Sequence, residues 1–299
     1  MKDLTPPIDG ETRFIALLGY PVEHTLSPRI HNAALQAQGL NVRYGAFAVT
    51  PHNLEAAVSG VRSLGFLGAN VTLPHKASVL PMMDELTPEA RAVGAVNTIV
   101  CRNAGGVGRT RLVGDNTDVE GFLAPIAHHH DALEGAEVVV LGSGGAARAV
   151  AYAIANRLHP GSLTFVARSP VRAGRMVEEV LSNAEDAGGM QVRVVPHQEG
   201  SPAIRAARLV VNATPVGMRP DVDASPWTDA SDLHEGQLVY DLIYNPRATR
   251  FLQMARGRGA VVVDGLEMLI AQAAASYRQW TGREMPADAV RTALEGYGS

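Results

Sequence analysis

The chain has 299 residues, 46% of them hydrophobic, and its 26 basic and 30 acidic side chains give a net charge of −4. This length suits two domains with buried cores, and the charge excludes a general attraction to nucleic acid or to anionic membranes. No apolar run reaches membrane-spanning length and the first residues lack the apolar stretch of a signal peptide, so we expect a cytoplasmic protein. The single cysteine, Cys101, has no partner for an internal disulfide and no metal-ligand partner at a useful spacing, so we expect it in a strand and expect no metal site.

Strand-like and helix-like segments alternate from the N-terminus to about Asn116, and this alternation predicts a first α/β unit. Strands are expected at residues 14–18, 43–49 and 68–73, and helices at residues 27–38, 53–64 and 88–93.

The third of these strands carries polar groups on one face. Asn70 and Thr72 share a face because side chains alternate along a strand, and Val71 and Leu73 on the other face are expected in the core. A proline then stops the strand, and Lys76 follows it. An amide, a hydroxyl and an ammonium group in this order would hold a small polyhydroxylated substrate beside a proton carrier. The alternative is a buried strand that runs into a surface loop with a solvated lysine.

Two further polar clusters follow where apolar or glycine-flanked segments end. The first, Ala95–Thr98, contains Asn97, and the second, Gly114–Asp118, ends in a carboxylate just before a helix-like segment. Asn, Asp and Thr are the usual residues at helix starts, so helix capping is the alternative role for Asp118.

A glycine-rich turn then connects an apolar strand to a helix. The strand Val138–Leu141 runs into the turn 142–146, and Ala147 stands in place of the third glycine, a variant that the dinucleotide-binding fingerprint allows. Glycines let the backbone approach a pyrophosphate, and the N-terminus of a helix supplies N–H groups to it. We therefore predict a dinucleotide site at this turn.

The residues after the next strand indicate which dinucleotide binds. The strand Ser162–Ala167 is followed by Arg168 and Ser169, where an NAD site would offer a carboxylate to the ribose hydroxyls. Guanidinium groups instead match the oxygens of a 2′-phosphate, so the sequence predicts NADP. Arg172 and Arg175 follow closely, and the alternative of a solvated helix face fits Arg175 best.

Further strands are expected at residues 191–195, 209–212, 238–242 and 260–263, and a last helix at residues 267–280. The three consecutive histidines 128–130 cannot converge on one ion from a helix, so we interpret them as a solvated helix end. His75 is expected to point away from its neighbour Lys76 and to be a minor site residue at most.

These motifs together resemble those of shikimate dehydrogenases. The resemblance runs almost end to end, through the segments 19–28, 70–76, 95–98, 114–118, 142–147, 211–217, 240–246 and 264–272. It implies an NADP-dependent oxidoreductase that reversibly reduces 3-dehydroshikimate to shikimate on the way to chorismate and the aromatic amino acids. The implied fold is α/β, with an N-terminal substrate-binding domain (residues 1–117 and 265–299), a Rossmann-like NADP-binding domain (residues 118–264) and the active site in the cleft between the domains.

The resemblance also implies roles for single residues. It makes Lys76 and Asp118 catalytic, handling the proton that accompanies hydride transfer from C4 of the nicotinamide. The implied substrate-binding residues are Thr25, Ser27, Asn70, Thr72, Asn97, Tyr244 and Gln272. The implied cofactor-binding residues are Gly142, Ser143, Gly144, Gly145, Ala146, Ala167, Arg168, Ser169, Thr214, Leu242 and Gly265.

Three positions depart from the usual pattern of the family. Thr25 replaces the first serine of a Ser-x-Ser motif and adds a methyl group near the substrate carboxylate, which leaves the preference between shikimate and quinate open. Ala167 stands where asparagine is usual, so we expect weaker cofactor affinity but the same cofactor. Val119 stands where glycine is frequent, with no chemical consequence.

Two alternatives stay open: a quinate/shikimate dehydrogenase of broader range, and a catalytically inactive NADP-binding regulatory relative. The presence of both Lys76 and Asp118 disfavours the inactive relative. A reductase of another class on the same dinucleotide-binding unit would not account for the hydroxyl-rich first domain. We expect a monomer or homodimer that acts on a small molecule, without nucleic-acid or membrane partners.

Overall fold

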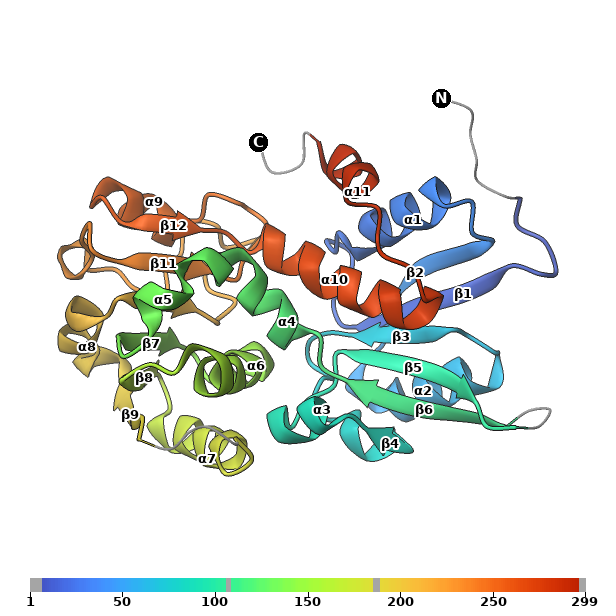
Figure 1. Ribbon diagram of the computed structural model, residues 1–299, viewed down its shortest axis with the longest axis horizontal. Coiled ribbons are helices and arrows are strands. Elements are labelled where there is room, and N and C mark those ends of the chain that lie inside the picture. The colour runs from blue at the N-terminus through green and yellow to red at the C-terminus, as the bar shows by residue number, and fades with distance from the viewer. Residues whose placement is uncertain (1–6, 106–108, 185–188, 296–299) are drawn as a thin grey trace. The chain divides into compact units, whose positions relative to one another are not determined.

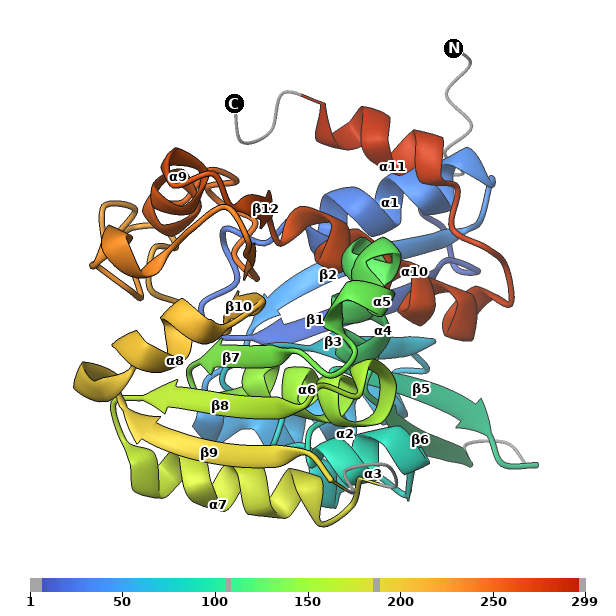
Figure 2. The same ribbon diagram turned by 60° about the vertical axis from the view of Figure 1, so that its left-hand side comes forward.

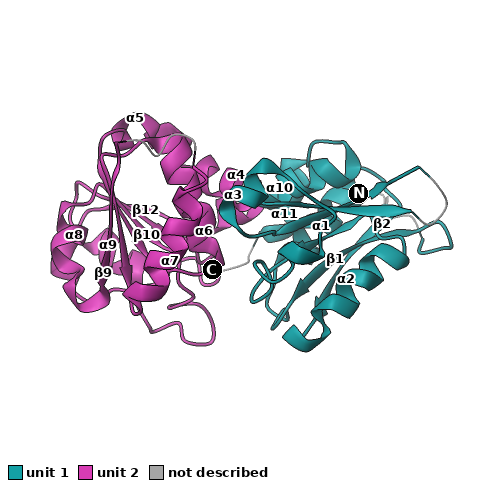
Figure 3. Ribbon diagram, turned by 90° about the horizontal axis from the view of Figure 1, so that it is seen from below, with its two compact units in different colours: residues 1–117, 272–297 teal, residues 118–271, 298–299 magenta. Residues whose placement is uncertain are grey.

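The computed structural model describes residues 7–105, 109–184 and 189–295, and most of its helices and strands are labelled in Figure 1. The chain divides into two compact units, coloured teal and magenta in Figure 3. Unit 1 runs to Thr117 and resumes at Gln272, and unit 2 comprises residues 118–271. The chain therefore returns from unit 2 to unit 1 inside helix α10 (Leu266–Thr281), whereas the division expected from the sequence places this boundary between residues 264 and 265.

Unit 1 contains a six-stranded mixed sheet. Its strands are β1 Arg13–Gly19, β2 Val42–Ala48, β3 Gly68–Val71, β4 Glu85–Leu86, β5 Thr98–Asn103 and β6 Thr110–Asp115, in the order β2-β1-β3-β5-β6-β4. Strand β1 is parallel to β2 and to β3, whereas β5 is antiparallel to both of its neighbours. Cys101 lies in β5, so its predicted place in a strand is confirmed.

Unit 1 also contains helices, several of which are short. They are α1 Ser27–Ala37, α2 Leu54–Ser63, α3 Pro88–Val93, the later part of α10 and α11 Ala287–Leu294, with 3-10 turns η1 Pro51–Asn53 and η2 Leu80–Met82. In α3, the Thr87 hydroxyl accepts the Ala90 N–H at 3.1 Å, and Gly94 ends the helix with a φ of 67°. A threonine N-cap and a left-handed glycine are the usual devices for a short helix.

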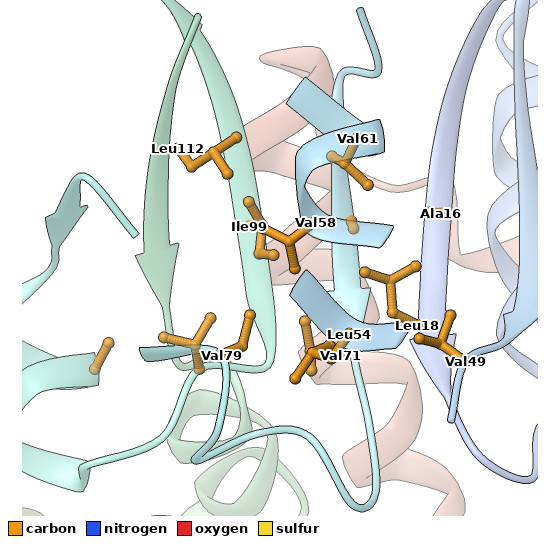
Figure 4. Close-up of a cluster of buried hydrophobic side chains, with 13 residues drawn as sticks. Ala16, Leu18, Val49, Leu54, Val58, Val61, Val71, Val79, Ile99 and Leu112 are labelled. Carbon is orange, nitrogen blue, oxygen red and sulfur yellow. The ribbon is translucent and has the colours of Figure 1, made fainter. Parts of the chain in front are cut away.

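The core of unit 1 lies between α2 and the sheet (Figure 4). Leu54, Val58 and Val61 recur at helical spacing, so they share one face of α2, and all three are buried. They belong to one cluster with Leu18 of β1 and Ile99 of β5. Burying each such side chain contributes about 1.5–3 kcal/mol. This packing holds the strands whose ends carry the polar residues of the site.

Unit 2 contains a second six-stranded sheet, and all of its strands are parallel. The strands are β7 Glu137–Leu141, β8 Ser162–Ala167, β9 Gln191–Pro196, β10 Leu209–Asn212, β11 Leu238–Asp241 and β12 Val261–Val263. The order is β12-β11-β10-β7-β8-β9, and Figure 2 shows β7, β8 and β9 side by side. From the β9 edge inward, this is the order 3-2-1-4-5-6 of the doubly wound dinucleotide-binding fold.

Helices connect the strands of unit 2. They are α4 Asp118–Leu123, α5 His130–Leu133, α6 Gly145–Ala153, α7 Pro170–Leu181, α8 Ser201–Ala206, α9 Arg250–Gly257 and the first turns of α10, with short turns η3 Ala124–His129, η4 Ile154–Leu158, η5 His197–Glu199 and η6 Ala230–Asp232. Four of the five residues of β7 are buried, as expected for a parallel strand between two layers of helices.

The predicted α/β fold class is confirmed, and the strands and helices named from the sequence occur within two residues of their expected bounds. One prediction about β3 is wrong. Leu73 was expected in the core, but 59% of it is exposed, because the strand ends at Val71 and the chain turns. Over the ranges that the structure describes, we find no helix long and apolar enough to cross a membrane. The same ranges contain no group of three side chains suited to a metal ion.

Candidate functional site

The carboxyl ends of five strands of unit 2 carry residues that the sequence assigned to a cofactor. Gly142 follows β7, Arg168 follows β8, Thr214 lies two residues after β10, Leu242 follows β11 and Gly265 lies two residues after β12. Because neighbouring strands are parallel and in register, these carboxyl ends lie side by side at the same end of the sheet. In doubly wound sheets, ligands bind just beyond the carboxyl ends of the strands.

The glycine turn after β7 is tightly packed at its start and open in its middle. Gly142 has a φ of +110°, and a Cβ there would lie 2.8 Å from Cγ2 of Thr214. Gly144 precedes helix α6, and a Cβ on it would have nothing within 4 Å. The turn therefore needs glycine at 142 for its own conformation, whereas the space at Gly144 is available to a ligand. The first N–H groups of α6 suit an anion in that space.

The polar residues after β8 are accessible. Arg168 and Ser169 are exposed, and so are Arg172 and Arg175 on α7. Ala167, the last residue of β8, is buried. The exposed guanidinium groups and the serine hydroxyl can therefore meet a phosphate group that approaches this end of the strand.

The loops after β11 and β12 are in direct contact. The Gly265 N–H donates to the Ile243 carbonyl at 3.0 Å. A Cβ on Gly265 would lie 2.1 Å from the carbonyl oxygen of Leu242, so only glycine fits there without moving the backbone. Tyr244 follows in the same loop and is half-buried. The contact ties the proposed substrate residue Tyr244 to the loop that begins α10.

A buried amide and a buried carboxylate lie just behind these loops. Asn212 ends β10 and Asp241 ends β11, and both are fully buried. Burial raises the pKa of the Asp241 carboxyl to about 6, although hydrogen bonds from Thr249, Ile243 and Asn212 act to lower it. Sequence reasoning missed both residues. The only available signal was that each polar side chain ends a wholly apolar strand.

In unit 1, the two hydroxyls of the Thr-x-Ser motif are joined to each other. The Thr25 hydroxyl donates to the Ser27 hydroxyl at 3.2 Å and accepts the Ser27 N–H at 3.3 Å. Ser27 is the first residue of α1 and is buried. Thr72, after β3, packs on Gly19, where a Cβ would lie 2.2 Å from Cγ2 of the threonine.

The side-chain amide of Asn70 is buried and oriented by hydrogen bonds. Its Oδ1 accepts from the Tyr44 hydroxyl at 2.8 Å. Its Nδ2 lies 3.1 Å from the Asn97 carbonyl, 3.2 Å from the Thr98 hydroxyl and 3.1 Å from the Ser276 hydroxyl. An amide oxygen has two lone pairs, so Oδ1 keeps capacity to accept a hydrogen bond from a ligand hydroxyl.

Asn97 belongs to the same buried network. Its Oδ1 accepts the Thr117 N–H at 2.8 Å, and its Nδ2 donates to the Thr117 hydroxyl at 3.0 Å. The Ser276 hydroxyl lies 2.8 Å from that of Thr98 and donates to the Gln272 carbonyl at 3.0 Å. Ser276 on α10 therefore joins β3 and the start of β5, next to Asn97, to the helical turn that carries Gln272. Sequence reasoning missed Ser276, whose only signal was its place one turn after Gln272.

Lys76 is half-buried in the turns that follow β3. Its carbonyl accepts the Val96 N–H at 2.8 Å. The neighbouring His75 is 1% exposed, and its Nε2 lies 2.6 Å from the Val49 carbonyl, which makes this nitrogen the donor. The backbone at the lysine is therefore anchored next to the end of β3.

Asp118 is the first residue of α4 and is 4% exposed. A carboxylate at this position is stabilised by the positive end of the helix dipole. The preceding Thr117 N–H is held by Asn97, which fixes the start of the helix. Lys76 belongs to unit 1 and Asp118 to unit 2, so their predicted pairing stays a prediction.

Comparison with known proteins relates both ends of the chain to one family. A family model described as the shikimate dehydrogenase substrate binding domain matches residues 17–99. A second model, described as the shikimate 5′-dehydrogenase C-terminal domain, matches residues 265–295.

Whole-length relatives agree with these matches. A shikimate dehydrogenase (NADP(+)) of Salinibacter ruber is 51% identical over 290 residues, which cover 96% of this chain and 99% of the relative. A crystal structure of a shikimate dehydrogenase in complex with NADP+ is 34% identical and has a TM-score of 0.86, with 97% of each chain covered. A quinate dehydrogenase of Corynebacterium glutamicum in complex with NAD is 31% identical and has a TM-score of 0.83, covering 95% of this chain and 98% of that one.

Proposed function

Because this chain belongs to the shikimate dehydrogenase family, we propose that it reversibly reduces 3-dehydroshikimate to shikimate with NADPH. It is an NADP-dependent oxidoreductase of the shikimate pathway, which leads to the aromatic amino acids. The observation that carries this function is the whole-length similarity to shikimate dehydrogenases, and the cofactor half is supported by the five strand-end loops at the carboxyl ends of a 3-2-1-4-5-6 sheet.

Unit 2 holds the cofactor. The open space at Gly144 and the first N–H groups of α6 suit the pyrophosphate, since a side chain there would block its approach. Arg168 and Ser169 bind the 2′-phosphate, and Thr214, Leu242 and the backbone at Gly265 border the nicotinamide half. The remaining cofactor contacts come from Gly142, Ser143, Gly145, Ala146 and Ala167.

Unit 1 holds the substrate. The hydroxyls of Thr25 and Ser27 bind the substrate carboxylate together with Tyr244. The ring hydroxyls are bound by Asn70, Thr72, Asn97 and Gln272. Support comes from the buried network that orients Asn70 and Asn97, because an amide of fixed orientation discriminates between donor and acceptor groups of a ligand.

Lys76 and Asp118 handle the proton. The nicotinamide ring supplies or accepts the hydride at the ring carbon that bears the oxygen. The Lys76 ammonium group stabilises the negative charge that develops on that oxygen and gives it a proton, and in the reverse direction it takes the proton back. The Asp118 carboxylate is the partner of Lys76 in this proton transfer.

Further properties belong to the same proposal. The enzyme works in the cytoplasm as a monomer or homodimer and uses neither a metal ion nor a nucleic-acid or membrane partner. A second candidate function is a quinate/shikimate dehydrogenase of broader range. It is favoured by the structural similarity to a quinate dehydrogenase and by the extra methyl group of Thr25 near the proposed carboxylate site.

The test is to follow the absorbance of the reduced cofactor with shikimate and with quinate, each with NADP+ and with NAD+. The expected result is turnover of shikimate with NADP+ and of neither quinate with NADP+ nor either substrate with NAD+. Comparable turnover of quinate would move the assignment to the broader enzyme. No turnover with either substrate, in protein that binds NADP+, would favour an inactive regulatory relative.

A further inference from the structure

Asp241 lies at the end of β11, and none of its surface is exposed. Its Oδ1 accepts hydrogen bonds from Asn212 Nδ2 at 2.9 Å and from the Ile243 N–H at 3.1 Å. Its Oδ2 accepts from the Thr249 hydroxyl at 2.7 Å. The carboxylate thus has donors from two strand ends and one helix start, and no role in the chemistry described above uses it.

One set of bonds leads from Asp241 toward the glycine turn. Asn212 Oδ1 accepts from the Thr214 N–H at 3.0 Å and from its hydroxyl at 2.7 Å. Because Asn212 Nδ2 donates to Asp241 and lies 3.4 Å from the Val216 carbonyl, the amide oxygen must face Thr214. Thr214 in turn packs against Gly142, whose missing Cβ would lie 2.8 Å from its methyl group. Asp241 therefore fixes the orientation of the Asn212 amide. That amide in turn holds Thr214 against the glycine turn.

A second set of bonds leads toward Tyr244. The Ile243 N–H that Asp241 accepts lies directly before this residue. Thr249 closes the other end of the same loop, since its hydroxyl also accepts the Leu252 N–H at 3.3 Å and caps α9. Both ends of the loop 242–249 are therefore attached to one carboxylate.

We propose that Asp241 is a positioning residue that sets the cofactor loop after β10 and the substrate loop after β11 together. The inference rests on the proposed function, because it takes Thr214 as a cofactor residue and Tyr244 as a substrate residue. Asp241 touches neither ligand. It acts on NADP+ through Asn212 and Thr214, and on shikimate through the Ile243 backbone.

The experiment measures the dissociation constants of NADP+ and of shikimate by calorimetry on the full chain. Asp241→Ala leaves the Asn212 amide and the Ile243 N–H without their buried acceptor, and we expect both ligands to bind about tenfold more weakly. Asp241→Asn keeps an acceptor oxygen toward both groups, and its affinities should return to within about threefold of the wild type.

A matched control is available in the same unit. Asp232 is also fully buried and accepts hydrogen bonds from Ser201 at 2.7 Å, Arg205 at 2.5 Å and Trp227 at 3.0 Å. None of these three partners is a proposed site residue. Asp232→Ala should lower the melting temperature while leaving both dissociation constants within about twofold of the wild type.

Asn212→Ala distinguishes the positioning of the two loops from a general loss of stability of unit 2. It removes the acceptor of the Thr214 N–H and hydroxyl and one donor to Asp241, but it leaves the bonds from Ile243 and Thr249 to that carboxylate in place. We therefore expect about tenfold weaker NADP+ binding and unchanged shikimate binding. It also decides the matter if Asp241→Ala does not fold. Wild-type protein that fails to bind NADP+ would refute the proposed function itself. Wild-type binding with unchanged NADP+ affinity in Asn212→Ala, or equal losses in the Asp232 control, would overturn the positioning role.

Discussion

Replacement of Gly144 by alanine tests whether the glycine turn of unit 2 binds a pyrophosphate. Gly144 has a φ of −88° and a ψ of −168°, an extended conformation that any residue adopts. A Cβ at this position would have nothing within 4 Å. The folded chain therefore accommodates the methyl group without strain. The free energy of unfolding should stay unchanged or rise by about 0.4–1 kcal/mol, because alanine restricts the unfolded chain.

The affinity for NADP+ should change in the opposite direction. If the pyrophosphate lies against the Gly144 backbone, the added methyl group occupies its place, and the ligand or the turn must shift. Forcing one extra methyl into a close contact costs about 1–3 kcal/mol, which corresponds to a dissociation constant about 5–150-fold higher. Thermal unfolding and calorimetric titration with NADP+ measure the two quantities separately.

Two other glycines serve as controls for this substitution. Gly174 lies inside α7 with nothing within 4 Å of a Cβ, so Gly174→Ala should raise stability by about 1 kcal/mol and leave NADP+ binding unchanged. Gly142 has a φ of +110° and contacts Thr214, so Gly142→Ala should lower both stability and affinity. An unchanged NADP+ affinity in Gly144→Ala would refute the close approach of a pyrophosphate to this turn.

Three further predictions concern the reaction, the cofactor and the core. Lys76 and Lys2 are the only lysines in the chain. Lys76→Ala should cut turnover about 10²–10⁴-fold with a modest effect on shikimate binding. Lys76→Arg should not restore turnover, because a guanidinium keeps its proton. Near-normal steady-state turnover in either variant would remove lysine from the mechanism. Arg168→Asp should raise the KM for NADP+ at least about tenfold and lower the preference for NADP+ over NAD+, because a carboxylate repels a 2′-phosphate; an unchanged ratio of the two kcat/KM values would argue against this site. Burial lowers the pKa of His31 from 6.5 to about 3, so the folded state resists protonation of this ring. Above pH 6.5 the ring is neutral in both the folded and the unfolded state. As pH falls from 6.5 toward 3 only the unfolded state takes up the proton, so the free energy of unfolding falls by up to about 5 kcal/mol. His31→Phe should therefore flatten this part of the stability curve in chemical unfolding measured across pH, and parallel curves for the two proteins would contradict the assignment.

The local elements could be predicted from the sequence because their causes lie in neighbouring residues. Alternation and apolar runs identified β8 and β10 at their observed bounds, and the glycine turn with its flanking strand and helix identified the dinucleotide unit. Side-chain type alone indicated the chemistry of Arg168. The roles of Lys76 and Asp118 came from the resemblance to a family, because spacing cannot show that residues 42 positions apart act together.

Only the tertiary structure decided which buried groups support the site. The hydrogen bond between Asn70 and Ser276 joins residues 206 positions apart, and the bond between Asn212 and Asp241 exists because β10 and β11 are neighbours in the sheet. No local pattern encodes such partners, since they depend on strand order and on which face of a helix packs against the sheet. Leu73 was misplaced for the same reason, because the end of a strand depends on whether its neighbours continue to pair with it. The sequence by itself therefore determined the elements and the chemical types at their ends, and strand pairing decided which of those ends support one another.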